Sequence, residues 1–131
     1  MTDAEFIAAL ESCTLPAEDF GPAARVRAGY LYLRLGSFGE AIDRTGTAIR
    51  RYATSLGQPD RYHETITVGF LALIRQRICE RGDGGGWPGF ASANPDMFER
   101  DLLLRYFPRS QLDSPLARKV FVLPQSAEAR S

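Results

Sequence analysis

The chain has 131 residues, of which 44% are hydrophobic and 24% charged, and sixteen basic side chains balance sixteen acidic ones. This length fits one domain with a single core, and the composition excludes a disordered chain. The zero net charge removes the overall attraction to phosphate on which nonspecific nucleic-acid binding depends, so we expect no nucleic-acid partner. The longest apolar run, residues 66–74, is far shorter than the roughly 20 residues that cross a bilayer.

The first residues lack the basic region of a secretory signal, which favours a cytoplasmic protein. Cys13 and Cys79 are far apart and lie in helical patterns, so we expect small buried side chains rather than a disulfide or a zinc site. His63 is the only histidine, and no recognised cofactor motif is present. We therefore expect neither a metal nor another cofactor.

Helical signals begin at the N-terminus. Thr2 followed by Glu5 is a capping box that predicts a helix over residues 2–12. Pro22 suits a first helical position and predicts a second helix, which Gly36 ends. Ser37 followed by Glu40 forms another capping box, and apolar residues at helical spacing extend this third helix to residue 56. Residues 22–56 are thus predicted to form a tight antiparallel hairpin.

A fourth helix is predicted over residues 60–81, with Asp60 as its N-cap. Its segment ITVGFLALI is apolar on almost every face, which is typical of a helix at the centre of a bundle. Residues 81–89 contain five glycines and a proline, so we expect a flexible linker without regular structure.

The remaining signals are again helix starts. Asn94-Pro95 and Ser114-Pro115 each place a capping residue before a proline and predict two further helices. We expect residues 120–124 to pack as an extended segment and residues 125–131 to be disordered. The predicted fold is all-α, a single domain over residues 1–124 with about six helices around the helix at residues 60–81.

Two resemblances add to these patterns. Residues 29–48, GYLYLRLGSFGEAIDRTGTA, resemble a single tetratricopeptide repeat, which implies a helical hairpin with small residues where the helices meet. A repeat protein needs at least three such units, and no second unit follows, so we expect an isolated hairpin.

Six further segments resemble a family of small, largely uncharacterised bacterial α-helical proteins: TLPAEDF (14–20), VRAGYLYLR (26–34), YHETIT (62–67), FASANPD (90–96), LLLRYF (102–107) and SPLARKVFVLP (114–124). Members of this family usually carry two histidines three residues apart after the phenylalanine that matches Phe20. With the YHET histidine, that pair suggests a polar or metal-binding cluster. Pro22 and Arg25 occupy the positions of the pair in this chain, so only His63 carries over. The resemblance lends no function.

The candidate site surrounds His63, at the predicted start of the central helix. A histidine at a helix N-terminus is held neutral by the helix dipole, so it could act as an acid, a base or an orienting donor. It could equally close the core through a hydrogen bond. We predict His63 and Glu64 as catalytic residues, and five ligand-binding residues: Arg25, Arg27, Tyr30, Tyr62 and Thr67. In this prediction an arginine holds a ligand carboxylate.

Three functions remain open at this point. The chain is a small-molecule-binding protein or cofactor-independent enzyme, a protein-interaction or regulatory module, or a family member that has lost its catalytic residues and acts as a scaffold. A closed pocket at His63 would favour the first function, and an exposed apolar groove on the hairpin of residues 22–56 would favour the second. The partner is thus a small molecule or a protein, and a homodimer is compatible with the sequence.

Overall fold

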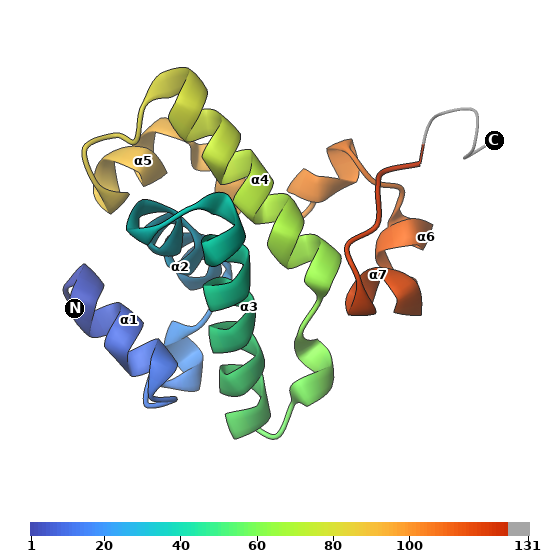
Figure 1. Cartoon of the computed structure of the whole chain (residues 1–131), viewed down its shortest axis with the longest axis horizontal. Helices are drawn as coiled ribbons and strands as arrows, with labels where there is room; N and C mark the ends of the chain where they lie inside the picture. Colours follow the sequence, from blue (N-terminus) through green and yellow to red (C-terminus); the bar gives the residue numbers. More distant parts are fainter. Residues whose placement is uncertain (126–131) are drawn as a thin grey trace.

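The helices follow the predicted order closely (Figure 1). The computed structural model describes residues 1–125, and these are all-helical, without a β-strand. The described residues form seven α-helices: α1 (Asp3–Glu11), α2 (Pro22–Leu35), α3 (Phe38–Ser55), α4 (Glu64–Arg81), α5 (Trp87–Ala93), α6 (Arg109–Leu112) and α7 (Pro115–Lys119). Four short 3-10 segments connect them: η1 (Ala17–Asp19), η2 (Pro59–Arg61), η3 (Pro95–Phe98) and η4 (Leu102–Arg105). The predicted all-α bundle is confirmed, with one α-helix more than expected.

Helices α1 and α3 both start with the capping boxes that the sequence predicts. The Thr2 hydroxyl accepts a hydrogen bond from the N–H of Glu5, and the N–H of Thr2 donates the reciprocal bond to the Glu5 carboxylate, which completes the capping box. Ser37 and Glu40 make the same pair of bonds before α3. Both boxes satisfy N–H groups that lack partners in the first helical turn. The predicted hairpin is therefore present as α2 and α3.

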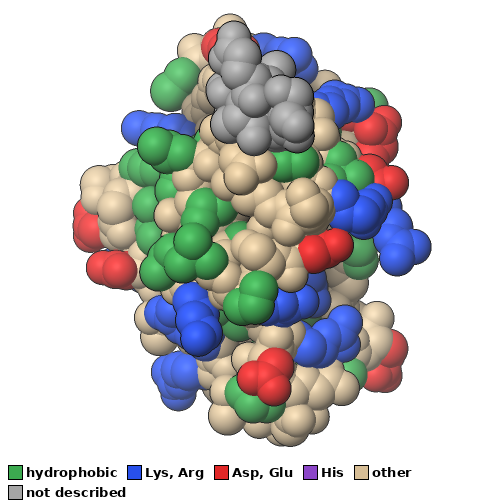
Figure 2. Space-filling view, turned by 90° about the vertical axis from the view of Figure 1, so that its right-hand side faces the viewer, with side chains coloured by type: hydrophobic (Ala, Val, Ile, Leu, Met, Phe, Trp, Pro, Cys, Tyr) green, Lys and Arg blue, Asp and Glu red, His purple; other side chains and the backbone are tan. Residues whose placement is uncertain are grey.

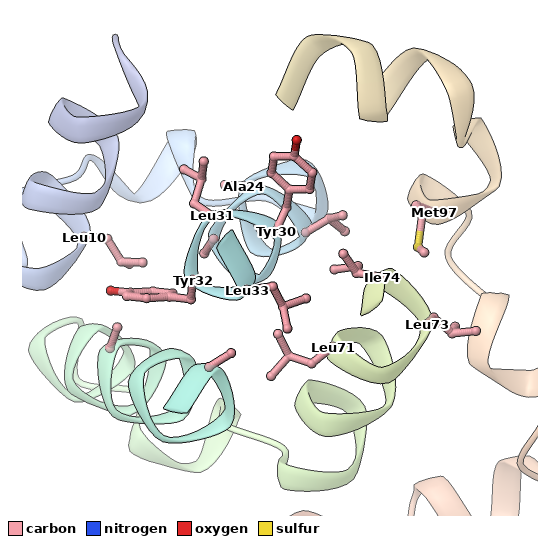
Figure 3. Packing of buried hydrophobic residues seen from close by; sticks show 14 of the residues in the cluster. Leu10, Ala24, Tyr30, Leu31, Tyr32, Leu33, Leu71, Leu73, Ile74 and Met97 are labelled. Carbon is pink, nitrogen blue, oxygen red and sulfur yellow. The ribbon is translucent and has the colours of Figure 1, made fainter. Parts of the chain in front are cut away.

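The core lies where α2, α3 and α4 pack against one another, and α1 packs against α3. Figure 3 shows Leu33 of α2 facing Leu71 and Ile74 of α4, and Tyr32 turned the other way, towards Leu10 of α1. A Cβ on Gly29 would lie 3.1 Å from a methyl group of Leu71, so this glycine lets the two helices approach closely. Helix α4 also packs against α3, η4 and α7, which gives it the predicted central place.

The start of α4 differs from the prediction. Asp60 does not cap α4, because residues Pro59–Arg61 form the separate segment η2. The helix begins at Glu64, and its N-cap is His63, whose ring accepts a hydrogen bond from the backbone of Ile66. His63 thus lies at the cap rather than within the first turn, because a bond to a distant part of the chain fixes it there, as described below.

The glycine-rich segment was predicted to be a linker through residue 89, and this is wrong for its last three residues. Helix α5 starts at Trp87, directly after residues 82–86. Its rings pack on Tyr30 of α2, with centroids 5.6 Å apart for Trp87 and 4.9 Å for Phe90. Pro88 costs little helix stability because it occupies the first turn, where proline is tolerated. The aromatic packing on Tyr30 then outweighs the low helix propensity of Gly89.

Beyond α5 one predicted helix start is replaced and the other is confirmed. Asn94-Pro95 opens only the short η3, and the Asn94 side chain does not cap it. Its amide instead donates to the carbonyl of Phe90 and accepts from two arginines of α4, Arg77 and Arg81. Ser114 caps α7 as predicted, by accepting a hydrogen bond from the backbone of Ala117.

The last described residues are tied to α4. Residues 120–124 lie outside regular secondary structure, as predicted. The Thr65 hydroxyl donates to the carbonyl of Val120 over 2.8 Å and accepts from the N–H of Val122 over 3.1 Å. The predicted disordered segment 125–131 falls outside the described residues except for Gln125, whose N–H donates to the Gln111 side chain.

The prediction that Cys13 and Cys79 are buried is wrong. Cys13 is half-buried and adopts a positive φ of 60° after the end of α1, and Cys79 is exposed on α4. Cys79 is exposed because it lies on the face of α4 that carries Arg75 and Gln76, both exposed, rather than on the face that meets α2.

An ion pair fixes α4 to η3 and gives a prediction for stability against pH. Two short hydrogen bonds, of 2.6 and 2.7 Å, join the Arg77 guanidinium to the Asp96 carboxylate, and they hold the pKa of Asp96 at about 2, below its ordinary 3.8. Because the folded pKa is depressed, this stabilisation is complete above pH 3.8 and is lost as the pH falls towards 2. Asp96→Asn should lower the free energy of unfolding at pH 7 by about 2 kcal/mol.

Urea unfolding at neutral pH and near pH 2.5 would check this. The difference between wild type and Asp96→Asn should shrink at the acidic pH. Asp43→Asn, at an exposed carboxylate without an ion pair among the described residues, is the control and should change little at either pH. Equal losses at both pH values would contradict the assigned role of the Arg77–Asp96 pair.

Candidate functional site

Both ring nitrogens of His63 are engaged. Nδ1 accepts a hydrogen bond of 3.1 Å from the N–H of Ile66, so the neutral ring carries its proton on Nε2. Nε2 lies 2.7 Å from the carbonyl oxygen of Leu112 at the end of α6, and donates to it. Only 8% of the residue is exposed. His63 therefore joins the start of α4 to the C-terminal part of the chain, and no ring nitrogen is left free.

The other residues of the YHET segment form a second set of bonds. The Tyr62 hydroxyl donates to the Glu64 carboxylate, and burial together with this bond raises the pKa of Tyr62 to about 12. The Thr67 hydroxyl donates to the carbonyl of His63, one turn earlier in the chain, over 2.8 Å. The Arg50 guanidinium stacks over the Tyr62 ring, 4.9 Å from its centroid. Tyr62 thus bridges α4 and α3.

A cavity of about 580 Å³ opens between the start of α2 and the start of α4, and we call it the α2–α4 pocket. Arg25, Tyr62, His63 and Thr67 all line it, so the structure brings four of the seven predicted site residues together. The apolar lining comes from α2, α3, α4, η3, η4 and α6: Val26, Ile49, Ile66, Phe70, Leu71, Ile74, Met97, Leu103, Leu104 and Leu112. A concave apolar volume of this size is typical of small-molecule sites.

The remaining three predicted residues lie elsewhere. Glu64 is adjacent to the pocket but does not line it. Arg27 points to α1, where it forms an ion pair of 2.7 Å with Asp3 and stacks over Phe6. Tyr30 is fully buried, and its hydroxyl donates to the carbonyl of Asp83 over 2.7 Å. Neither Arg27 nor Tyr30 is in position to contact a ligand in the α2–α4 pocket.

The charged groups of the pocket are unevenly paired. Five arginines and four acidic residues line it: Arg25, Arg61, Arg100, Arg109 and Arg118, and Asp60, Glu99, Asp101 and Asp113. Two of the acids are neutralised by ion pairs, Glu99 by Arg105 and Asp101 by Arg109. The other four arginines make no ion pair with any described residue. The pocket therefore carries an excess of positive charge.

Arg25 and Arg61 are the two arginines whose interaction can be specified. Loss of surrounding water, and then repulsion from Arg61, lower the pKa of the Arg25 guanidinium, and both side chains line the α2–α4 pocket. Within residues 1–125 Arg25 makes only a stacking contact with Phe20, and Arg61 donates to the neutral side chain of Gln58. Two like charges that make no ion pair form a site that favours an anion.

Thr45 of α3 is a pocket residue that the sequence did not indicate. The residue is only 2% exposed, yet its hydroxyl has no hydrogen-bond partner among the described residues. Sequence patterns give no signal for this, because a threonine in a helix ordinarily bonds a carbonyl one turn back. Arg61 was also missed, although it directly precedes the YHET segment.

Exposed apolar side chains gather on the face that carries α7 and the residues after it (Figure 2). Leu116 is 62% exposed and Leu123 is 77% exposed. On the α2–α3 hairpin, by contrast, the large exposed apolar residues are Leu35 and Leu56, at opposite ends of the hairpin. The hairpin thus lacks the continuous apolar groove expected of an interaction module.

Residues 1–125 contain no group of three or more histidine, cysteine or acidic side chains placed to hold a metal ion. In the same part of the chain, no helix is both long and apolar enough to cross a membrane. Searches with family models, against curated proteins and against solved structures found no match. The resemblance to the YHET family and to a tetratricopeptide hairpin therefore stays a prediction.

Proposed function

We propose that this protein is a small-molecule-binding protein whose ligand occupies the α2–α4 pocket. The observation that carries this proposal is the pocket itself, about 580 Å³ of largely apolar volume with charged residues around it. An apolar cavity with a few polar groups is the usual design of a ligand site, because burial of the ligand supplies affinity and the polar groups orient it.

The hydrogen bonds of His63 favour binding over acid–base catalysis. A general base must have a free lone pair within reach of the proton that it removes. In His63 the Nδ1 lone pair accepts from Ile66, and the Nε2 proton is donated to Leu112. The imidazole ring of His63 therefore forms part of the pocket wall and takes no part in proton transfer.

The test uses a neutral apolar probe, n-octanol, and two matched variants of α4. Ile66→Trp places a large ring in the pocket, whereas Ile78→Trp makes the same change at a half-buried isoleucine that does not line it. In amide NMR titrations, n-octanol should shift resonances of pocket residues in wild type and in Ile78→Trp. Ile66→Trp should lose this response, because the indole fills the volume that the probe needs.

Two results would overturn the proposal. One is the absence of pocket shifts in the wild-type titration. The other is equal binding of n-octanol by Ile66→Trp and Ile78→Trp, since the probe would then bind outside the pocket. The amide spectra also report whether each variant is folded, so a loss of binding through unfolding is recognised directly.

A further inference from the structure

We propose that the ligand of the α2–α4 pocket is an amphiphilic organic anion, with its acid group held by Arg25 and Arg61 and a polar atom of its body bonded to Thr45. This inference rests on the proposed function and names the chemical class of the ligand. Three observations carry it: the unpaired arginines, the unpartnered threonine and the apolar wall between the helices that bear them.

The arginines specify the acid group. Arg25 projects from the first turns of α2 and Arg61 from η2, and both line the pocket without an ion pair to any described residue. Two guanidinium groups that repel each other are stabilised when a carboxylate or phosphate binds between them. Asp60, the neighbour of Arg61 in sequence, also lines the pocket and makes no ion pair with a described residue. The Arg118 guanidinium, which also lines the pocket, donates to the backbone carbonyl of Asp60.

The threonine specifies a second polar contact. Both threonines of α4 are satisfied: Thr67 donates to the carbonyl of His63, and Thr65 donates to the carbonyl of Val120. Only Thr45 keeps a buried hydroxyl without a partner in residues 1–125. A buried hydroxyl without a hydrogen bond is destabilising, and natural proteins leave few of them. A ligand atom that accepts or donates a hydrogen bond would remove this penalty.

The apolar wall specifies the body of the ligand. Ile49, one turn after Thr45 on α3, and Ile66 and Phe70 of α4 all line the pocket. Such a surface gains affinity from an aliphatic or aromatic ligand body and offers little to a strongly polar one such as a sugar phosphate. Together the three features describe an acid with an apolar body that carries a hydroxyl, carbonyl or ether group.

The acid group is tested by comparing octanoate with n-octanol, which share a chain length and differ in charge. Octanoate should bind wild type about tenfold more tightly, because hydrogen bonds to charged groups are the stronger ones. Arg25→Met should remove most of this preference and leave n-octanol binding within about twofold. Arg51→Met, at an exposed arginine of α3 that does not line the pocket, is the control and should keep the preference.

The threonine contact is tested with hydroxyoctanoate isomers, which carry the hydroxyl at different positions along the chain. One isomer should bind wild type about fivefold or more tighter than octanoate, since it alone reaches Thr45. Thr45→Val should abolish this preference while octanoate still binds, and the thermal midpoint of the ligand-free variant should not fall. Thr47→Val, at an exposed position of α3, should keep the preference.

The outcomes separate this inference from the proposed function. If n-octanol binds in the pocket but octanoate binds no more tightly, the inference that the ligand carries an acid group is wrong, and the proposed function stands. If no hydroxyoctanoate isomer is preferred, or if Thr45→Val keeps the preference, the assigned role of Thr45 is wrong. If neither n-octanol nor any acid shifts pocket resonances, the proposed function itself fails.

Discussion

Gly89→Ala should lower the free energy of unfolding by about 3 kcal/mol or more, the largest effect that we expect from a single substitution. A Cβ at Gly89 would lie 2.0 Å from the carbonyl oxygen of Gly84, which is far inside van der Waals contact. Backbone atoms form the obstacle, so rotation of a side chain cannot relieve it. Helix α5 would have to move, and with it Phe90, which is only 1% exposed and packs on Tyr30.

Thermal unfolding measures this effect against a matched glycine. Gly39 lies in α3 with nothing within 4 Å of an added Cβ. Gly39→Ala should therefore raise the free energy of unfolding by about 0.5 kcal/mol, since alanine restricts the unfolded chain and favours a helix. Gly89→Ala should lower the midpoint by about 10 °C or more. A midpoint within a few degrees of wild type would show that Gly84 and Gly89 are not in this close contact.

His63→Ala should destabilise the protein by about 3 kcal/mol, because two hydrogen bonds are lost at once. The N-cap bond to Ile66 contributes about 1 kcal/mol. The carbonyl of Leu112 also loses its donor, which costs about 1–3 kcal/mol when the group stays away from water. His63→Asn separates the two terms, because asparagine is a good N-cap but is too short to reach α6. Urea unfolding should place His63→Asn between wild type and His63→Ala.

Nitrogen NMR of the single histidine gives an independent check on this assignment. The hydrogen bonds require the proton on Nε2 and a bare Nδ1, so Nε2 should resonate as a protonated nitrogen and Nδ1 as an unprotonated one. The opposite tautomer would contradict the N-cap role. Rapid averaging of the two nitrogens would place the ring in water and would contradict the bond to Leu112.

The sequence predicted the first half of the fold because the signals there are local. The capping boxes of Thr2 and Ser37 and the proline at position 22 act within four residues of the helix ends that they define. The start of α4 was missed for the opposite reason. Asp60 is the better N-cap by residue type, but His63 is fixed by Leu112, 49 residues away in the chain.

Only some of the predicted site residues line the α2–α4 pocket, and helix geometry explains why Arg25 does and Arg27 does not. Arg25 and Arg27 are two residues apart on α2, so their side chains point about 200° apart around the helix axis. Only one of them can face a given pocket, and spacing alone could have shown this. The unpartnered hydroxyl of Thr45 could not have been predicted, because a sequence pattern does not show which donors and acceptors the folded chain places within hydrogen-bond distance of that hydroxyl.

The glycine-rich segment shows a related limit. Five glycines and a proline between residues 81 and 89 indicate a turn, but they do not tell how tightly the turn closes. Gly84 adopts a φ of +75° and touches the backbone of residues 89 and 90, which brings Trp87 and Phe90 onto Tyr30. The packing of the aromatic side chains thus stabilises a helix in a segment whose glycine and proline content predicted no regular structure.

The way in which α4 holds the C-terminal residues has a consequence for redesign of the protein. His63 and Thr65 anchor that segment through backbone atoms, at the carbonyls of Leu112 and Val120 and the N–H of Val122. These backbone anchors do not depend on the side chain of the exposed residue Asp113, which lines the pocket from this segment. Arg118 differs, because its guanidinium also ties the segment to η2 through the carbonyl of Asp60. Under the proposed function, a library at position 113 should therefore alter ligand preference with little loss of stability.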